Sequence, residues 1–305
     1  MKKRWIIAVG VVAALFMAGC EQTGNNLEEL DDNVTIAEEE IADLKSAEAT
    51  DGDVCAARFA GHMFSGGMMM GGYHLFFGNG FPPCATVTVD SEEFPKTVTI
   101  NYEEGCTGRM GLQKKGIITI YMTDTIINEG AEYTVTYDNL VMGQREISKT
   151  AYFKNLGPND DGNWVISYEL SSTTTFEKNG QEYIIVRELS GEREWLDGFD
   201  TPQMSDDIFF LSGSGTITVN DEIKFTKEII EPLLIDRACR FPLSGIVEIT
   251  RNDETMTIDF GTGECDNIAV VTKDGESEEI ELNSGHFGKG FHRHFRHMKQ
   301  NKGWW

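Results

Sequence analysis

The chain has 305 residues and a formal net charge of −24 at pH 7. That length is sufficient for one large β domain or two smaller ones. A chain this acidic is repelled by nucleic acid and by anionic lipid headgroups, so we expect no nucleic-acid partner.

Residues 1–19 have the pattern of a secretory signal peptide. A cationic start at 2–4 (KKR) precedes an apolar run at 5–16 and a small-residue cleavage site. The run is too short for an ordinary membrane span. Cys20 follows Ala18 and Gly19, which resembles a bacterial lipoprotein signal, and that resemblance implies that Cys20 is acylated. We therefore expect an exported protein whose membrane partner is reached through lipid, although its own charge opposes contact with the membrane.

Residues 20–54 form a predicted acidic stem, with twelve acidic residues and one basic residue between positions 21 and 53. Apolar residues recur at helical spacing in this stretch: Leu27, Leu30, Val34, Ala37, Ile41 and Leu44. One interpretation is a short coiled coil that pairs neighbouring molecules. The charge density favours an extended spacer in which helix forms only transiently.

Residues 55–83 are rich in glycine, methionine and aromatic residues, and they include a candidate set of metal ligands: His62, Met68, Met70 and His74. Thioether and imidazole groups suit Cu(I) and other soft metals. Methionine also fills irregular apolar surface, so the favoured interpretation is a segment that packs against a sheet or touches lipid. No resident cofactor is expected, and copper or zinc is the alternative.

From 84 to 282 the pattern predicts an all-β domain. Apolar and polar residues alternate with period two, as at 97–102 (TVTINY) and 164–170 (WVISYEL), which is typical of half-buried strands. Turn signals separate the strands at 128–130, 159–163, 178–180 and 273–275. This spacing predicts an antiparallel sheet, and it does not distinguish a sandwich, a curved half-barrel and a flat meander.

An internal repeat lies near 84–124 and 239–282. The segment 97–102 (TVTINY) resembles 255–260 (TMTIDF), and a related phrase begins at Gly116, Gly215 and Gly245. Cysteines bound both units, so we expect two hairpins closed by the disulfides Cys84–Cys106 and Cys239–Cys265, although sequence does not fix connectivity. Cys55 is then left as a free thiol or as a bridge to another chain. The duplication is best explained by folding, because neither copy contains a polar cluster typical of a site.

Several phrases resemble uncharacterised lipoproteins from Bacteroidota. They are 193–202 (REWLDGFDTP), 231–234 (EPLL) leading to 239–240 (CR), and 259–267 (DFGTGECDN), with Gly-Cys at 105–106 and Lys-Gly at 115–116. The resemblance covers about 84–282. It implies an all-β protein of the cell envelope, in the outer membrane of a Gram-negative bacterium, and it implies no activity.

Residues 283–305 form a basic, aromatic tail that we expect to be disordered. Three of its histidines are metal candidates: His292, His294 and His297. Neutral imidazole is the form that binds metal, so such binding would weaken below a pH of about 6.5. The alternative is contact with a membrane interface or an anionic glycan.

Enzymatic patterns are weak in this chain. No histidine lies between His74 and His286, so a Ser-His-Asp triad in the β domain would have no base. Trp195, beside Asp197 and Asp200, is a candidate for stacking on a sugar, and a buried corner aromatic is the favoured interpretation. We expect a non-catalytic binding or structural module, with an envelope glycan or protein as partner. The alternatives are a metal-handling lipoprotein and, ranked below it, an envelope glycan hydrolase.

Overall fold

The computed structural model describes residues 85–102, 105–107, 113–178, 180–201 and 204–282. All strands belong to one compact unit, Lys45–Glu281. The second unit comprises Met1–Leu44 and Leu282–Trp305, and of it only Leu282 falls within the described residues.

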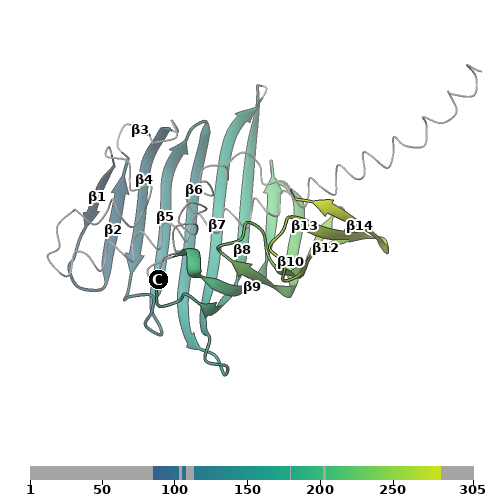
Figure 1. Cartoon of the computed structure of the whole chain (residues 1–305). Helices are drawn as coiled ribbons and strands as arrows, with labels where there is room; N and C mark the ends of the chain where they lie inside the picture. Colours follow the sequence, from purple (N-terminus) through teal and green to yellow (C-terminus); the bar gives the residue numbers. More distant parts are fainter. Residues whose placement is uncertain (1–84, 103–104, 108–112, 179, 202–203, 283–305) are drawn as a thin grey trace, which may run out of the picture. The chain divides into compact units, whose positions relative to one another are not determined.

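Within these residues, fourteen antiparallel strands form a single open sheet (Figure 1). The strands are β1 Thr86–Val89, β2 Lys96–Asn101, β3 Cys106–Thr107, β4 Gln113–Met122, β5 Glu132–Met142, β6 Arg145–Pro158, β7 Trp164–Lys178, β8 Gln181–Asp197, β9 Ile208–Val219, β10 Glu222–Asp236, β11 Ser244–Arg251, β12 Glu254–Thr262, β13 Ile268–Lys273 and β14 Glu276–Glu281. Each strand pairs with the next along the chain, except at β3. There β2 pairs with β4, and the short strand β3 pairs with the first two residues of β4. The predicted antiparallel all-β fold is confirmed, and the meander is one sheet instead of a two-sheet sandwich.

The predicted turns separate neighbouring strands of this meander. The signals at 128–130, 159–163, 178–180 and 273–275 lie between β4 and β5, β6 and β7, β7 and β8, and β13 and β14. Three further hairpin turns were not predicted, and one of them, at 143–144, joins β5 and β6. The other two share one conformation. They consist of Asn220-Asp221 and Asn252-Asp253, in which all four residues have φ between 50° and 66°. That pair of positive φ values matches the tight two-residue turn that antiparallel strands favour.

One face of the sheet, which we call the apolar face, carries the buried side chains. Val98, Ile120, Val135, Ala151 and Val247 are at most 1% exposed. In register they form continuous cross-strand contacts, as in Val98 opposite Ile120 and Ile120 opposite Val135. Burial of such rows is the main favourable term in the stability of the sheet.

Four cationic residues also lie buried on the apolar face: Lys96, Lys149, Arg193 and Lys227. The ammonium of Lys149 lies 4.8 Å from the ring centroid of Tyr137, and the guanidinium of Arg193 lies 5.3 Å from that of Tyr168. Both separations are within the range of a cation–π interaction, which offsets part of the cost of removing the charge from water.

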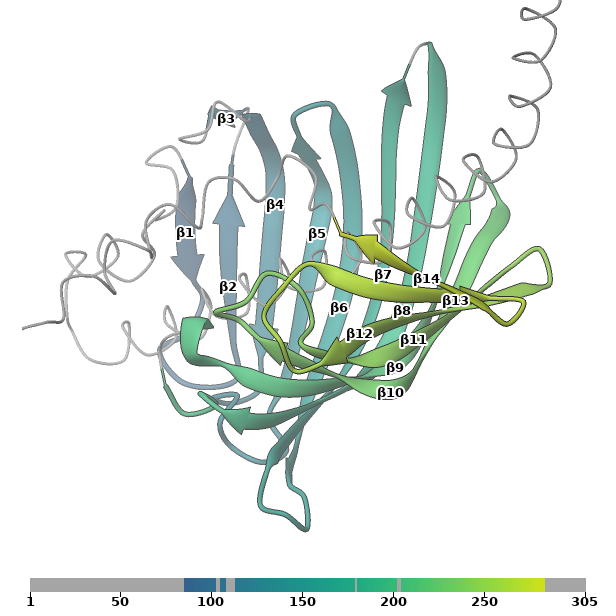
Figure 2. The same ribbon diagram turned by 45° about the vertical axis from the view of Figure 1, so that its right-hand side comes forward.

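The sheet is strongly curved, and β9–β14 turn out of the plane of β1–β8 (Figure 2). Gly191 on β8 pairs with Gly213 on β9, at a point where the two backbones approach closely. A Cβ atom on Gly191 would lie 1.9 Å from the carbonyl oxygen of Ser212, and one on Gly213 would lie 2.2 Å from that of Ser190. Only glycine fits this approach.

Two glycines of the repeated phrase lie at irregularities of the pairing. Gly116 and Gly245 have φ of 109° and 106°, and the register shifts next to each of them. Such β-bulges bend a strand and increase its local twist. The copies at Gly116 and Gly245 therefore bend the sheet, whereas Gly215, in the third copy, lies in regular pairing.

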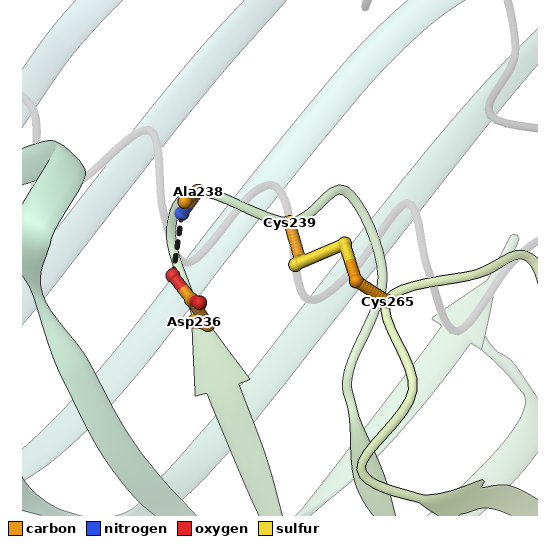
Figure 3. Close-up of a disulfide and its surroundings, with 4 residues drawn as sticks. All are labelled: Asp236, Ala238, Cys239 and Cys265. Atoms are coloured by element: carbon orange, nitrogen blue, oxygen red, sulfur yellow. Dashed lines mark hydrogen bonds between the residues drawn. A yellow bond between two sulfur atoms is a disulfide. The ribbon is translucent and has the colours of Figure 1, made fainter. Parts of the chain in front are cut away.

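The structure contains a disulfide between Cys239 and Cys265, which encloses the β11–β12 hairpin (Figure 3). Their Cα atoms lie 5.8 Å apart, within the usual range for a disulfide. The backbone N–H of Ala238 donates to the Asp236 carboxylate over 2.7 Å and shapes the turn that leads into Cys239. Cys106 is also disulfide-bonded, and its partner, like Cys84, lies outside the described residues.

Candidate functional site

The face opposite the apolar face, which we call the hydroxyl face, carries two parallel rows of polar side chains. The register of β6–β11 places residues of six strands side by side in each row. Row 1 consists of Thr150, Ser171, Glu188, Thr216, Thr226 and Thr250. Row 2 consists of Tyr152, Glu169, Ser190, Ser214, Glu228 and Glu248.

These twelve residues line a groove of 760 Å³, together with Leu170, Leu189, Gly215 and Lys227. Because neighbouring strands lie about 4.8 Å apart, six strands give the groove a length of about 24 Å. The two rows are separated by two residues along each strand, which is about 7 Å. The site is therefore long and narrow, and it runs across the strands instead of along them.

Both rows continue beyond the groove on neighbouring strands. Row 1 extends through Thr136, Thr119, Thr99 and Thr88 on one side and through Thr255 on the other. Row 2 extends through Thr134, Tyr121 and Thr97, and on its other side through Thr257, Thr272 and Ser277. A hydroxyl-bearing surface therefore crosses almost the entire sheet.

The groove is acidic at its centre. Four of its lining residues are glutamates, and the one cationic lining residue, Lys227, has its side chain buried on the apolar face. Glu228 and Glu248 lie directly opposite each other on β10 and β11. Like charges in such a cross-strand pair destabilise a sheet, so this arrangement is unfavourable for folding.

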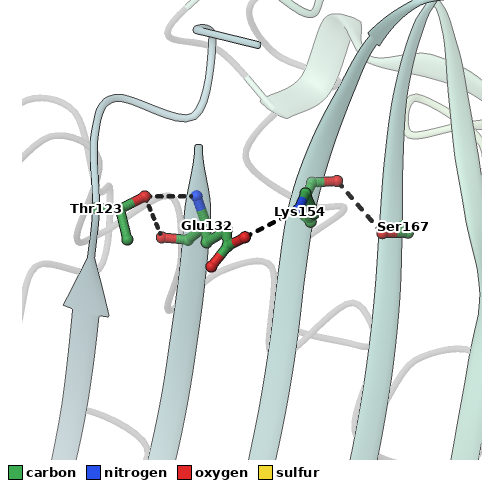
Figure 4. Close-up of polar contacts among 4 residues, drawn as sticks. All are labelled: Thr123, Glu132, Lys154 and Ser167. Atoms are coloured by element: carbon green, nitrogen blue, oxygen red, sulfur yellow. Dashed lines mark hydrogen bonds and ion pairs between the residues drawn. The ribbon is translucent and has the colours of Figure 1, made fainter. Parts of the chain in front are cut away.

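A polar cluster borders row 2 on β5 and β6 (Figure 4). The ammonium of Lys154 lies 3.0 Å from a carboxylate oxygen of Glu132, and the Tyr152 hydroxyl hydrogen-bonds with the same carboxylate. The backbone N–H of Glu132 donates to the Thr123 hydroxyl over 2.8 Å, and the Ser167 hydroxyl donates to the Lys154 carbonyl over 3.5 Å. The cluster holds the Tyr152 ring at the end of the groove.

These contacts shift the titration of three groups. The hydrogen bond from Lys154, followed by that from Tyr152, lowers the pKa of Glu132 below its ordinary value of 4.5. Burial, followed by the bond to Glu132, raises the pKa of Tyr152 above 10.0. The hydrogen bond to Glu132 raises the pKa of Lys154 above 10.5.

The cluster should make stability depend on pH. Since the folded state lowers the pKa of Glu132, its contribution is present above pH 4.5 and disappears as pH falls through the folded-state pKa. Glu132→Gln should therefore lower the urea midpoint at pH 7 and leave it unchanged at pH 2. The second arm repeats the comparison in a protein that carries Lys154→Met. Because the cationic partner of Glu132 is then absent, adding Glu132→Gln should change the urea midpoint little at pH 7. A difference between wild type and Glu132→Gln that is independent of pH would contradict this assignment.

Trp195, the candidate sugar-stacking residue, lies on the apolar face and does not line the groove. Its ring centroid lies 5.7 Å from that of Phe199 and 5.1 Å from that of Phe209, and Trp164 stacks on Phe199 at 5.1 Å. Because Trp195 shares the face of buried Arg193, two residues earlier in the strand, it belongs to the core corner. Trp195 itself is half-buried there.

The other candidate site residues lie outside the described residues. They are Cys20, Cys84 and the metal candidates His62, Met68, Met70, His74, His292, His294 and His297. In the described part of the chain, no group of three or more His, Cys, Asp or Glu side chains is arranged to hold a metal ion. In the same part, no helix has the length and hydropathy that a membrane span requires.

The groove residues were not predicted from the sequence. Their signal was present as threonine and serine on alternate positions of the predicted strands. Alternation assigns a residue to a face but does not reveal which residues of different strands lie side by side, because this depends on register.

Compared with protein-family models, with curated protein sequences and with solved structures, the chain has no match in any of the three.

Proposed function

We propose that this protein is a lipid-anchored cell-envelope protein that acts as a non-catalytic binding module, with the groove across β6–β11 as its binding surface. Lipid on Cys20 would anchor the chain, and the acidic stem would hold the sheet away from the membrane. The observation that carries the proposal is the alignment of twelve polar side chains from six strands along one groove.

The composition of the groove supports binding over a structural role alone. A solvated sheet face usually carries mixed charges, whereas the two rows here contain four glutamates and no cationic residue. The opposed pair Glu228 and Glu248 costs stability without an evident folding benefit. Residues that break a local folding rule are expected at functional sites.

The test uses the full chain produced in a Gram-negative host and purified in detergent. We expect it to bind isolated envelope fragments, and we expect Glu188→Lys with Glu228→Lys to weaken binding at least tenfold. Glu192→Lys with Glu182→Lys is the matched control, because both are exposed carboxylates outside the groove. In cells, wild type should fractionate with membranes and Cys20→Ser should not.

Equal binding by the groove variant and the control variant would refute the groove as the binding surface. Membrane association that survives Cys20→Ser would refute the lipid anchor. Circular dichroism and a urea midpoint for each variant distinguish lost binding from lost folding.

A further inference from the structure

We propose that the ligand of this groove is a neutral glycan chain that lies extended across the strands, along rows 1 and 2. This inference rests on the proposed function and adds the chemical class and the orientation of the ligand. Its basis is the geometry and the chemistry of the two rows.

The groove has the shape of a site for a linear polymer. It is about 24 Å long, about 7 Å wide between the rows, and open along its length because it lies on a sheet surface. A compact small molecule would contact only part of it. The strand spacing of about 4.8 Å is similar to the advance of an extended β-linked glycan per sugar ring, so successive sugars would meet successive strands.

The side chains of the rows match the polar edges of sugars. Each serine or threonine hydroxyl both donates and accepts a hydrogen bond, and each glutamate carboxylate accepts from two neighbouring hydroxyls. Within the described residues, the side chains of Ser171, Ser190 and Ser214 make no hydrogen bond, so they are available to a ligand. At the end of row 2, the amphipathic ring of Tyr152 provides an apolar surface for the face of a sugar.

The charge of the groove selects among polymers. Glu169, Glu188, Glu228 and Glu248 would repel anionic polysaccharides and nucleic acid. An apolar chain would leave the hydroxyls and carboxylates desolvated without partners, which is costly. A neutral glycan avoids both the repulsion and the desolvation cost, because it carries no negative charge and its hydroxyls donate hydrogen bonds to the carboxylates.

The experiment measures depletion of the full chain, in detergent, by insoluble neutral glucan, chitin and pectate, followed by titration with oligosaccharides of one to eight sugars. We expect binding to a neutral polymer and not to pectate. Affinity should rise with oligosaccharide length and level off near five or six sugars. The groove spans six strands, and a longer chain would extend beyond it. A single sugar that binds as tightly as the longer chains would overturn the inference.

The critical variant is Thr216→Val with Thr226→Val, which replaces two row 1 hydroxyls by methyl groups and keeps β-branched side chains in the strands. We expect it to weaken glycan binding at least tenfold. Thr218→Val is the matched control, because Thr218 lies two residues further along β9, on the same face and outside the groove. If Thr218→Val weakened glycan binding as much as the double variant does, the inference would be overturned.

The outcomes also separate this inference from the proposed function. If no glycan binds but envelope fragments still bind in a manner that depends on Glu188 and Glu228, the glycan inference fails and the binding module stands. If envelope fragments do not bind either, both fail.

Discussion

Replacing Gly191 with alanine should destabilise the sheet by at least about 3 kcal/mol, the upper range for overpacking a well-packed site. The new Cβ would lie 1.9 Å from the Ser212 carbonyl oxygen and 2.8 Å from the Cα of Gly213. Both are backbone atoms, which cannot move away as the end of a side chain can. The clash would force β8 and β9 apart at the point where the sheet curves.

The urea midpoint of the full chain, followed by circular dichroism, measures this effect. Ser190→Ala is the matched control, because Ser190 is the adjacent residue and points to the exposed hydroxyl face. Its effect should stay within about 0.5 kcal/mol, as for most surface substitutions. If Gly191→Ala were as stable as Ser190→Ala, the close approach of β8 and β9 would not be needed for the fold.

Removing the Cys239–Cys265 disulfide should cost about 3 kcal/mol. The bridge joins residues separated by 26 positions, and closing a loop of that size restricts the unfolded chain by roughly this amount on the chain-entropy estimate. The double variant Cys239→Ser with Cys265→Ser should therefore unfold at a lower urea concentration than wild type under non-reducing conditions.

The appropriate control is Ala238→Ser, which changes an exposed residue of the same turn and leaves the bridge intact. Reductant alone is a poorer test, because it would also open the disulfide of Cys106. A loss below about 1 kcal/mol in the double variant would show that the β11–β12 hairpin is held by its strand pairing and not by the bridge. Single variants are avoided because they leave a reactive thiol.

Many of the strands were predictable because their pattern is local. In the segment 97–102, alternate residues are apolar, and Val98 and Ile100 lie buried on the apolar face as period two requires. The turn at 159–163 was predictable because its residue types favour chain reversal. The Asn220-Asp221 turn was not predicted because neither residue is glycine, although asparagine and aspartate also tolerate positive φ.

The groove could not be predicted from the same pattern. Thr216 and Glu188 are 28 positions apart, and they become neighbours only because β8 and β9 pair in one register. A shift of a single residue would move every side chain of the strand to the other face. Trp195 shows the same dependence on the fold. Its sequence neighbours left a sugar site open beside the favoured corner aromatic, and the structure places its ring on the apolar face, 5.1 Å from that of Phe209.

The all-β class, the antiparallel strands and several of the turns could be predicted from the sequence, because they depend on the periodicity and conformational preferences of adjacent residues. Three features became visible only with the strands paired: one curved open sheet, the approach of Gly191 to Gly213, and the two polar rows that line a groove. The glycine approach and the rows depend on cross-strand register, and the bulges at Gly116 and Gly245 add curvature, so both follow from how residues far apart in the chain align.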